Sequence, residues 1–426
     1  MKKRVVIYGI NYAPEIAGVG KYTGEIGEYL ASQGHDVCVI TAPPHYPGWA
    51  PKDGHSAKRW SKSRIHGSDI YRCPLYLHPE MRGIRRLIAP LTFALSSAPV
   101  AFYQILKRRP DVVIAIEPTL FVAPIALAAS WIAGSKRVLH VQDLEIDAAF
   151  AMGHLRFKSL AKIATAFERG VMNRFDRIVT ISARMAEKIY DKGVDPKKLE
   201  IVRNWVDLDA VKPMPSPLGY REELGLKASD FVVLYSGNLG PKQGIGLLIE
   251  AARQLANEPD VVFAIAGQGP MRAEIERATQ VLPNVRLYDF QPKERFGEFL
   301  NVADVHALPQ ERHAADLLLP SKLGGMLASG RPIIVTAEPG TELASFVTTS
   351  CALTKPGDAR ALADAVRALR SGETSPTNLA HRLRLASSLA KPRLIDIFTR
   401  VALFLNPEAP TPVPAHEAAQ NGAVHA

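Results

Sequence analysis

Short apolar runs rich in β-branched residues alternate with longer stretches of helical periodicity along most of the chain. Runs of this kind, when helices separate them, indicate parallel strands that are covered on both faces of a sheet. The pattern therefore predicts an α/β protein. The first half contains the runs RVVIYGI, VCVIT, DVVIAI, RVLHV and RIVTIS, and the second half contains FVVLYSG, VVFAIAG, DVHALP and PIIVT.

The two sets of runs are separated by DLDAVKPMPSPLGY at 207–220, a segment that is rich in proline and lacks periodicity. We interpret it as a linker between a first domain, 1–206, and a second domain, 221–405. Residues 406–426 are rich in proline and alanine, so we expect a disordered tail. Two doubly wound domains joined in this way predict a cleft where the carboxyl ends of their strands face each other.

Positive charge is concentrated in one part of the first domain. Residues 52–109 hold twelve lysines and arginines against three acids, which gives +9 of the formal net charge of +10. This stretch ends in RRLIAPLTFALSSAPVAFYQILKRR, an apolar segment with basic residues at both ends. Pro90, Pro99 and the polar pair Ser96-Ser97 argue against a membrane-spanning helix.

We therefore expect this basic stretch to lie on the anionic surface of the inner membrane. The alternative is a set of core helices whose ends carry solvated charge. Nucleic acid is not the expected partner, because the basic residues do not interleave with an aromatic platform.

Cysteine usage and the amino-terminal stretch bear on location. Cys38, Cys73 and Cys351 show neither a paired framework nor the spacing of metal ligands, which favours a reducing cytoplasm. The stretch MKKRVVIYGI has too short an apolar run for a signal peptide, and we interpret it as a first strand. We therefore expect a cytoplasmic protein, peripheral on the inner face of the plasma membrane.

The stretch EIAGVGKYTGEI at 15–26 is similar to the end of a P-loop. A P-loop reading fails, because Glu15 stands at the first glycine position and Tyr22 at the hydroxyl position. What remains is a strand, a loop with Gly18 and Gly20, and a helix. We expect Gly20 to adopt a positive φ and to let an acceptor, or the donor phosphates, approach the backbone. The alternative is that both glycines only turn the chain.

A glycine-rich turn links a strand to a helix in the second half, in YSGNLGPKQGIGLLIEAA at 235–252. The turn contains Gly237, Gly240 and Gly244, and Lys242 lies within it. Exposed backbone N–H groups at the following helix start can hold an anion.

A second helix start with a lysine occurs in LPSKLGGMLASGRPIIV at 319–335, where Pro320, Ser321 and Lys322 precede a helical stretch. Together with the turn around Lys242, it predicts a diphosphate site that uses N–H groups and ammonium charge without a metal. The alternative is that both lysines face water.

These motifs together resemble a known family, the two-Rossmann-domain (GT-B) retaining glycosyltransferases of family 4, and within it the group of colanic-acid and related exopolysaccharide biosynthesis. The resemblance runs to about residue 400. It is carried by YAPEIAGVGKYTGEIGEYLASQGHDVCVIT, VQDLEIDAAFAMG, IVRNWVD, YSGNLGPKQG, AGQGP and LPSKLGGMLASGRP.

The resemblance implies transfer of a hexose from a GDP- or UDP-linked sugar to a lipid-linked saccharide, with retention at the anomeric carbon. Within the colanic-acid group it favours a deoxyhexose such as fucose. It implies no cofactor and no metal. The donor residues that it implies are Gly237, Asn238, Lys242, Gln243, Gly267, Asp316, Ser321 and Lys322. Catalytic roles fall on Asp143, Glu145 and Lys242, and the acceptor loop on Gly18 and Gly20.

The chain departs from the family pattern at several of these positions. Asn238 stands at the usual arginine position, and Lys242 lies one place early, followed by Gln243. Gly325 occupies the position of a glutamate that binds the nucleotide ribose, so Asp316 is a candidate substitute.

In the first half, Gln142-Asp143 replaces the usual His-Asp at a strand end. Asp143 and Glu145 could orient or deprotonate the acceptor hydroxyl, or simply cap the next helix. The DLD at 207–209 is similar to a metal motif of the other major glycosyltransferase fold, but it lies in the linker, so we do not assign it a metal.

Two other functions remain open at this stage. A nucleotide-sugar epimerase of the same fold would leave the basic apolar stretch unexplained. A non-catalytic carbohydrate-binding or scaffold subunit would follow if Asn238 and Gly325 mean that donor binding is lost.

Overall fold

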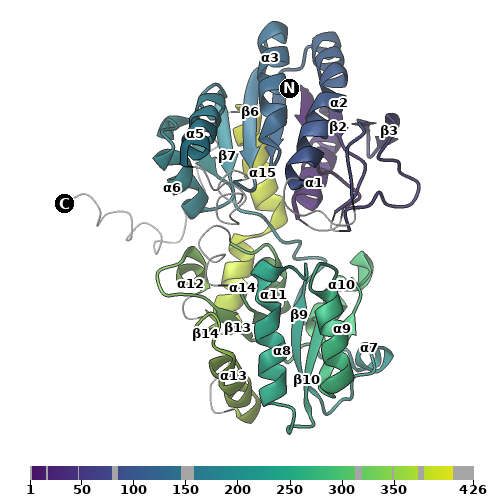
Figure 1. Cartoon of the computed structure of the whole chain (residues 1–426), viewed down its shortest axis with the longest axis vertical. Coiled ribbons are helices and arrows are strands. Elements are labelled where there is room, and N and C mark those ends of the chain that lie inside the picture. Colours follow the sequence, from purple (N-terminus) through teal and green to yellow (C-terminus); the bar gives the residue numbers. More distant parts are fainter. Residues whose placement is uncertain are drawn as a thin grey trace, which may run out of the picture.

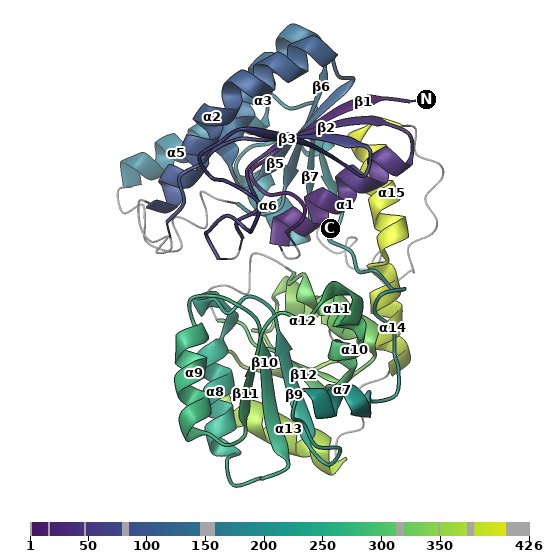
Figure 2. The same cartoon turned by 90° about the vertical axis from the view of Figure 1, so that its right-hand side faces the viewer.

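The computed structural model describes residues 2–15, 18–46, 48–78, 85–144, 158–311, 319–347, 350–372 and 379–405. These residues form two α/β domains, shown from one side in Figure 1 and after a quarter turn in Figure 2. One domain contains an eight-stranded sheet and the other a six-stranded sheet, as the sequence pattern predicts. Glu145, Asp316 and the predicted tail at 406–426 lie outside the described residues.

The first sheet has the strand order β3-β4-β2-β1-β5-β6-β7-β8, and each neighbouring pair is parallel except β3 with β4. The five predicted runs are all strands. The sequence pattern misses β3, β4 and β8, because β3 is a polar edge strand with exposed side chains and β8 is very short. The strands are β1 (Arg4–Tyr8), β2 (Asp36–Thr41), β3 (Ser61–Ile65), β4 (Ser68–Arg72), β5 (Val112–Glu117), β6 (Lys136–Val141), β7 (Arg177–Thr180) and β8 (Leu199–Ile201).

Helices cover both faces of this sheet, so it is doubly wound. One face packs against α2 (Arg85–Arg108), α3 (Ala123–Ala133), α5 (Lys158–Met172) and α6 (Ala183–Asp191). The other face packs against α1 (Gly18–Ser32) and, from the far end of the chain, α15 (Lys391–Ala402). Strand ends and helix starts therefore gather at the edge that faces the second domain.

Helix α2 runs without interruption through Pro90 and Pro99. Among the described residues, the part over Ile88–Arg108 is long and apolar enough to cross a membrane. Its inner side is nevertheless part of the domain core, since Phe93 and Ile105 are fully buried against the sheet. In this structure α2 serves as a covering helix of the first domain.

The second sheet has the order β11-β10-β9-β12-β13-β14, and all its pairs are parallel. The four predicted runs are all strands, while β11 and β14, which are short and partly exposed, are not anticipated by the pattern. The strands are β9 (Phe231–Ser236), β10 (Val261–Ala266), β11 (Val285–Tyr288), β12 (Val305–Leu308), β13 (Ile333–Thr336) and β14 (Ala352–Thr354).

Helices also cover both faces of the second sheet. One face packs against α8 (Ile245–Gln254), α9 (Arg272–Val281) and α13 (Ala359–Ser371). The other packs against α10 (Phe296–Asn301), α11 (Lys322–Ser329), α12 (Glu342–Val347) and α14 (Leu379–Ser388). The short α7 (Leu218–Glu223) begins inside the segment that the sequence predicts as a linker.

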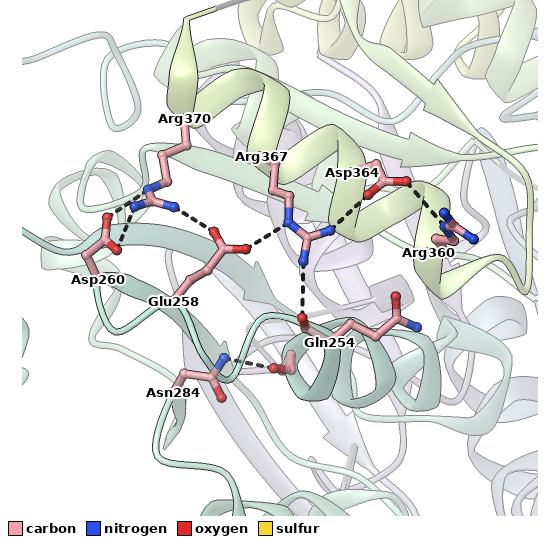
Figure 3. Close-up of polar contacts among 9 residues, drawn as sticks. Gln254, Glu258, Asp260, Asn284, Arg360, Asp364, Arg367 and Arg370 are labelled. Atoms are coloured by element: carbon pink, nitrogen blue, oxygen red, sulfur yellow. Dashed lines mark hydrogen bonds and ion pairs between the residues drawn. The ribbon is translucent and has the colours of Figure 1, made fainter.

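Two arginines of α13 form a network with the carboxyl end of α8 and the loop that follows it (Figure 3). Arg370 holds Glu258 at 2.6 Å and both oxygens of Asp260, while Arg367 donates to Glu258 at 2.7 Å and to the carbonyl of Gln254 at 3.2 Å. Cationic groups at the carboxyl end of a helix stabilise the helix, because they interact favourably with its dipole. The network therefore fixes the far end of the helix whose first turn lies at the candidate site.

Two segments cross between the domains side by side. The N–H of Val206 donates to the carbonyl of Leu389, and the N–H of Lys391 donates to the carbonyl of Val206, both at 2.8 Å. Beyond this crossing, α15 returns to the first sheet, where the Phe398 ring lies 4.7 Å from the ring of His140. Residues 391–405, which the sequence pattern places in the second domain, thus lie with the first. The remaining predicted boundaries stay predictions.

Candidate active site

The glycine-rich turn after β9 and the turn after β10 are held against each other. The N–H of Gly237 donates to the carbonyl of Ala266 at 3.0 Å, and the N–H of Leu239 donates to the carbonyl of Gln268 at 2.9 Å. A Cβ on Gly267 would lie 1.8 Å from the carbonyl oxygen of Gly237, so only glycine fits there. The two predicted donor residues Gly237 and Gly267 therefore form one compact turn at the carboxyl edge of the sheet.

Lys322, the first residue of α11, reaches into this turn. Its Nζ donates to the Tyr235 hydroxyl at 2.7 Å and to Oε1 of Gln243 at 2.8 Å, and lies 4.1 Å from the centre of the Tyr235 ring. A Cβ on Gly237 would come within 3.1 Å of this ammonium. Burial lowers the pKa of Lys322 to about 7. The structure thus brings together Lys322, Gln243 and Gly237, three of the predicted donor residues.

Two other predicted donor residues are placed differently. Lys242 lies in a single 3₁₀ turn, Pro241–Gln243, with its side chain exposed. Its ammonium contacts no other residue in the part of the chain that the structure describes. The carbonyl of Asn238 accepts a hydrogen bond from the Tyr235 hydroxyl at 2.7 Å, which fixes the turn. The roles predicted for Lys242 and Asn238 stay predictions.

Ser321 connects this site to the first domain. The sequence suggests that Ser321 caps α11, but its side chain makes no capping hydrogen bond. Its hydroxyl interacts instead with the hydroxyl of Tyr22 on α1, and this contact opposes the rise that burial causes in the pKa of Tyr22. Ser321 therefore lies where the first turns of α1 and α11 meet across the domains.

The first-domain loop is organised by a buried carboxylate, Glu15. Its Oε1 accepts the backbone N–H groups of His45 and Tyr46, both at 3.0 Å, and its Oε2 accepts from Nδ2 of Asn11 at 3.0 Å. A Cβ on Gly20 would lie 2.2 Å from Oε2 of Glu15. Gly20 thus makes room for this carboxylate.

The expectation that Gly20 adopts a positive φ is wrong. Helix α1 begins at Gly18, which has a φ of 63°, and Gly20 lies in its first turn. The Tyr46 ring lies 3.5 Å from the position of a Cβ on Gly18, and its phenol contributes to the raised pKa of Tyr235. The glycine loop of the first domain therefore stands opposite the Tyr235–Lys322 pair of the second.

A small crevice marks the meeting of the domains. It is lined by Ile181 and Asn204 from the first domain and by Leu319, Pro320, Ser321, Gly324 and Leu389. Beside it, the carboxylate of Glu342 accepts the N–H groups of Ala183 and Arg184 at 3.1 and 3.0 Å. This negative charge sits at the start of α6, where the helix dipole favours it. Glu342 also pairs with Arg203 at 3.3 Å, so the domains are held closed next to the site.

The remaining predicted residues are placed as follows. Asp143 follows β6 in a half-buried position at the carboxyl edge of the first sheet, whereas Glu145 and Asp316 lie outside the described residues. Gly325 faces α10, since a Cβ there would lie 3.0 Å from Cδ1 of Leu300. Gly325 therefore allows close packing of α11 against α10. Among the described residues, no group of three or more His, Cys, Asp or Glu side chains is arranged to hold a metal.

Sequence reasoning misses Tyr22, Tyr235, Glu15 and Glu342. Tyr235 lies 87 residues from Lys322 and belongs to an apolar strand run, so nothing local marks it as a site residue. For Glu15 the sequence offers a signal, a carboxylate where a P-loop has glycine, but two of its partners, His45 and Tyr46, come from another loop.

The fold and this arrangement define a glycosyltransferase of the GT-B class. Residues 17–205 match the model of the glycosyl transferase 4-like domain, and residues 230–371 match that of glycosyl transferases group 1. The chain is 39% identical over 357 residues to the putative colanic acid biosynthesis glycosyl transferase WcaI of Escherichia coli K12, covering 81% of this chain and 86% of that protein. The chain therefore belongs to the family 4 glycosyltransferases, in the colanic-acid group.

Two further comparisons bear on the sequence and on the fold. The chain is 31% identical over 122 residues to the Escherichia coli UDP-Gal:alpha-D-GlcNAc-diphosphoundecaprenol alpha-1,3-galactosyltransferase, covering 27% of this chain and 32% of that enzyme. The solved sucrose-phosphate synthase of Thermosynechococcus elongatus superimposes with a TM-score of 0.71 at 15% identity, covering 94% of this chain and 98% of that one. The second likeness confirms the fold.

Because the pKa of Lys322 is lowered to about 7, we predict that nucleoside diphosphate binding depends on pH. The ligand prefers the charged ammonium, which is fully present below the pKa of about 7 and is lost above it. We expect affinity to fall by up to about tenfold per pH unit above 7. Calorimetric titration with GDP and UDP between pH 6 and 9 measures this. Lys322→Arg, which stays charged, serves as the control for ionisation of the ligand itself. Parallel profiles for the two proteins would contradict the assignment.

Proposed function

We propose that this enzyme transfers a hexose from a nucleoside diphosphate sugar to a hydroxyl of a lipid-linked saccharide, with retention at the anomeric carbon, in exopolysaccharide biosynthesis. The observation that carries the proposal is the position of Lys322. Lys322 begins α11, and its ammonium reaches into the glycine-shaped turn that follows β9, opposite the loop of the first domain. Membership of the colanic-acid group supports the biosynthetic role.

The chemistry follows from charge development at the leaving group. The bond between the anomeric carbon and the diphosphate oxygen breaks, so negative charge grows on the diphosphate while the sugar becomes cationic. Lys322 and the N–H groups of the two helix starts stabilise that charge. The acceptor oxygen then bonds to the same face of the sugar. Asp143, at the carboxyl edge of the first sheet, is a candidate to orient this hydroxyl or take its proton.

The donor base and sugar are part of the proposal. We propose a GDP- or UDP-linked donor and, from the colanic-acid group, favour a deoxyhexose such as fucose. The galactosyltransferase relative acts, by its name, on a diphosphoundecaprenol-linked sugar. This supports a lipid-linked acceptor for the present enzyme.

The experiment that tests the function is product analysis. The purified protein is incubated with a panel of GDP- and UDP-sugars and a membrane lipid extract, and the glycolipid product is examined for its anomeric configuration by NMR. A new glycolipid with the donor's configuration supports the proposal. An epimerised nucleotide sugar without transfer would favour the epimerase, and the absence of GDP and UDP binding in titration would favour the scaffold.

We propose that the first domain contacts the cytoplasmic face of the membrane through α2. Leu91, Leu95 and Leu106 are exposed by 44%, 67% and 39%. Their spacing places them on one side of the helix, opposite the buried Phe93. A row of exposed leucines beside basic residues suits the boundary between headgroups and acyl chains.

Replacing Leu91, Leu95 and Leu106 together by serine is expected to release the protein from anionic vesicles at lower salt than the parent. The parent is expected to sediment with such vesicles at low salt and to leave them as ionic strength rises. Sedimentation across a salt series measures both. The control removes two exposed apolar side chains of the second domain, Leu218 and Val281, also by serine. Equal release of both variants would place the membrane contact elsewhere.

A further inference from the structure

A second hollow lies between the β3–β4 hairpin and α2, apart from the crevice between the domains. It is open to solvent, has a volume of about 240 Å³ and is lined by Trp60, Ser61, Lys62, Tyr71, Arg72, Cys73 and Val100. Strand β3 is the outer edge of the first sheet, beside α2 (Figure 1). None of these residues takes part in the donor site, so the hollow needs an explanation of its own.

The walls of this hollow are apolar and fixed. Trp60 is 60% exposed, yet its indole N–H donates to the carbonyl of Ser96 at 3.1 Å, so the ring is held in place with one face open. Tyr71 and Val100 form the opposite sides, and Cys73 is fully buried behind them. An exposed aromatic ring that is held open in this way favours an apolar ligand.

Arg72 lines the hollow next to Tyr71, but successive side chains of β4 alternate, so its guanidinium lies on the other face of the sheet. Two nitrogens of the Arg72 guanidinium donate to the carbonyls of Ala42 and Ala13, at 2.9 and 2.6 Å. The Arg72 side chain is buried and its Nε has no hydrogen-bond partner among the described residues. Inside the hollow, Trp60, Tyr71 and Val100 therefore offer surface for the apolar part of a ligand.

The rim is cationic. Lys58, Arg59 and Lys62 are exposed, and in the part of the chain that the structure describes none has a carboxylate within ion-pair distance. The ammonium of Lys62 lies 5.4 Å from the centre of the Tyr71 ring. These charges match a phosphate or diphosphate group placed at the mouth of the hollow.

The hollow opens toward the side of α2 that we propose to meet the membrane. Tyr103 is 59% exposed and follows Ser96 and Val100 along the helix at spacings of seven and three residues. Leu95 and Leu106 lie on the adjoining stripe. Leu95, Leu106 and Tyr103 thus give α2 an apolar surface beside the hollow, bordered by the Lys107 ammonium, which donates to the Tyr103 hydroxyl at 3.3 Å.

We propose that the hollow binds the first isoprenoid units of a polyprenyl diphosphate-linked acceptor, with its diphosphate held by Lys58, Arg59 and Lys62. The inference rests on the proposed function, which supplies the lipid-linked acceptor. Its size fits, since about 240 Å³ holds roughly eight carbons, or between one and two five-carbon units, if each carbon takes about the 30 Å³ of one water molecule. The hollow thereby selects the lipid carrier, while the crevice between the domains carries out transfer.

Binding of farnesyl diphosphate, a short soluble polyprenyl diphosphate, tests this proposal. Calorimetric titration is done with saturating GDP or UDP present, so that the donor site is occupied. We expect farnesyl diphosphate to bind at least tenfold more tightly than inorganic pyrophosphate. Trp60→Ala is expected to weaken it by about tenfold, and Val100→Trp, which fills the hollow, by at least as much. Trp131→Ala removes another exposed tryptophan, 77% exposed on α3, and is expected to leave binding unchanged.

The outcomes separate the proposals. Equal affinity for pyrophosphate and farnesyl diphosphate would overturn the proposed lipid site. So would unchanged binding in Trp60→Ala and Val100→Trp, if both variants unfold at the same temperature as the parent. Loss of binding to phosphatidylglycerol vesicles in Trp60→Ala, with farnesyl diphosphate binding unchanged, would assign the hollow to membrane phospholipid and overturn it as well. If the protein binds farnesyl diphosphate but transfers sugar to no acceptor, the proposed function is overturned, whereas the lipid site in the hollow is supported.

Discussion

Lys322→Ala is expected to lower kcat by about 10²–10³ while the fold stays intact. Removal of one preorganised charge that stabilises the leaving group typically has an effect of this size. The Lys322 ammonium is held by Tyr235 and Gln243, so it is in place before the diphosphate departs. Steady-state rates at saturating donor and acceptor, with thermal unfolding measured alongside, give the comparison.

The matched control is Lys227→Ala, which removes an exposed lysine of the same domain and is expected to leave kcat unchanged. Lys242→Ala is expected to impair transfer strongly as well, because Lys242 belongs to the same turn as Gln243. A Lys242 variant within threefold of the parent would show that it does not contact the leaving group. The same result for Lys322 would remove the observation on which the proposed mechanism rests.

Gly20→Val is expected to eliminate nearly all sugar transfer, while nucleoside diphosphate binding falls by less than about tenfold, or 1.4 kcal/mol. The added side chain would begin 2.2 Å from Oε2 of Glu15. Displacing this carboxylate releases the N–H groups of His45 and Tyr46, and so the loop that faces Tyr235. The donor half of the site lies in the other domain and stays folded.

Transfer rates and GDP or UDP titrations on the same preparation test this separation. Gly219→Val is the control, since a Cβ at Gly219, also in a helix, meets nothing within 4 Å. Glu15→Gln keeps the shape of the side chain but weakens its acceptors, and we expect an intermediate loss. Full activity in Gly20→Val would mean that Gly20 is dispensable. Loss of nucleotide binding would place the loop in the donor site itself.

The sequence predicts the sheets well, because their strands are buried on both faces and are therefore apolar throughout. It fails at β3, whose residues SKSRI are nearly all exposed, and at α15, whose amphipathic pattern does not indicate which sheet it covers. In the site, Lys322 and the glycine turn are visible because helix starts and tight turns are local features. The pairing of Lys322 with Tyr235 is not visible, since it depends on how α11 packs beside β9.

Gly20 shows the same limit in a single residue. Its sequence context indicates that a side chain is excluded, and this is correct. The reason is not backbone conformation but the carboxylate of Glu15, five residues earlier, which folds back over α1. A glycine that is required because a neighbouring side chain excludes a Cβ cannot be told from the sequence apart from one that is required because of a positive φ.

Because α15 packs on the first sheet, the first domain cannot finish folding until the end of the chain has been synthesised. The strands of the first sheet end at Ile201, but the helix that packs on His140 and Arg177 begins at Lys391. Domains usually fold as units as they leave the ribosome, the amino-terminal one first. Here the first domain keeps part of an apolar face uncovered until the second has emerged, so a nascent chain that stalls before Lys391 is a substrate for chaperones.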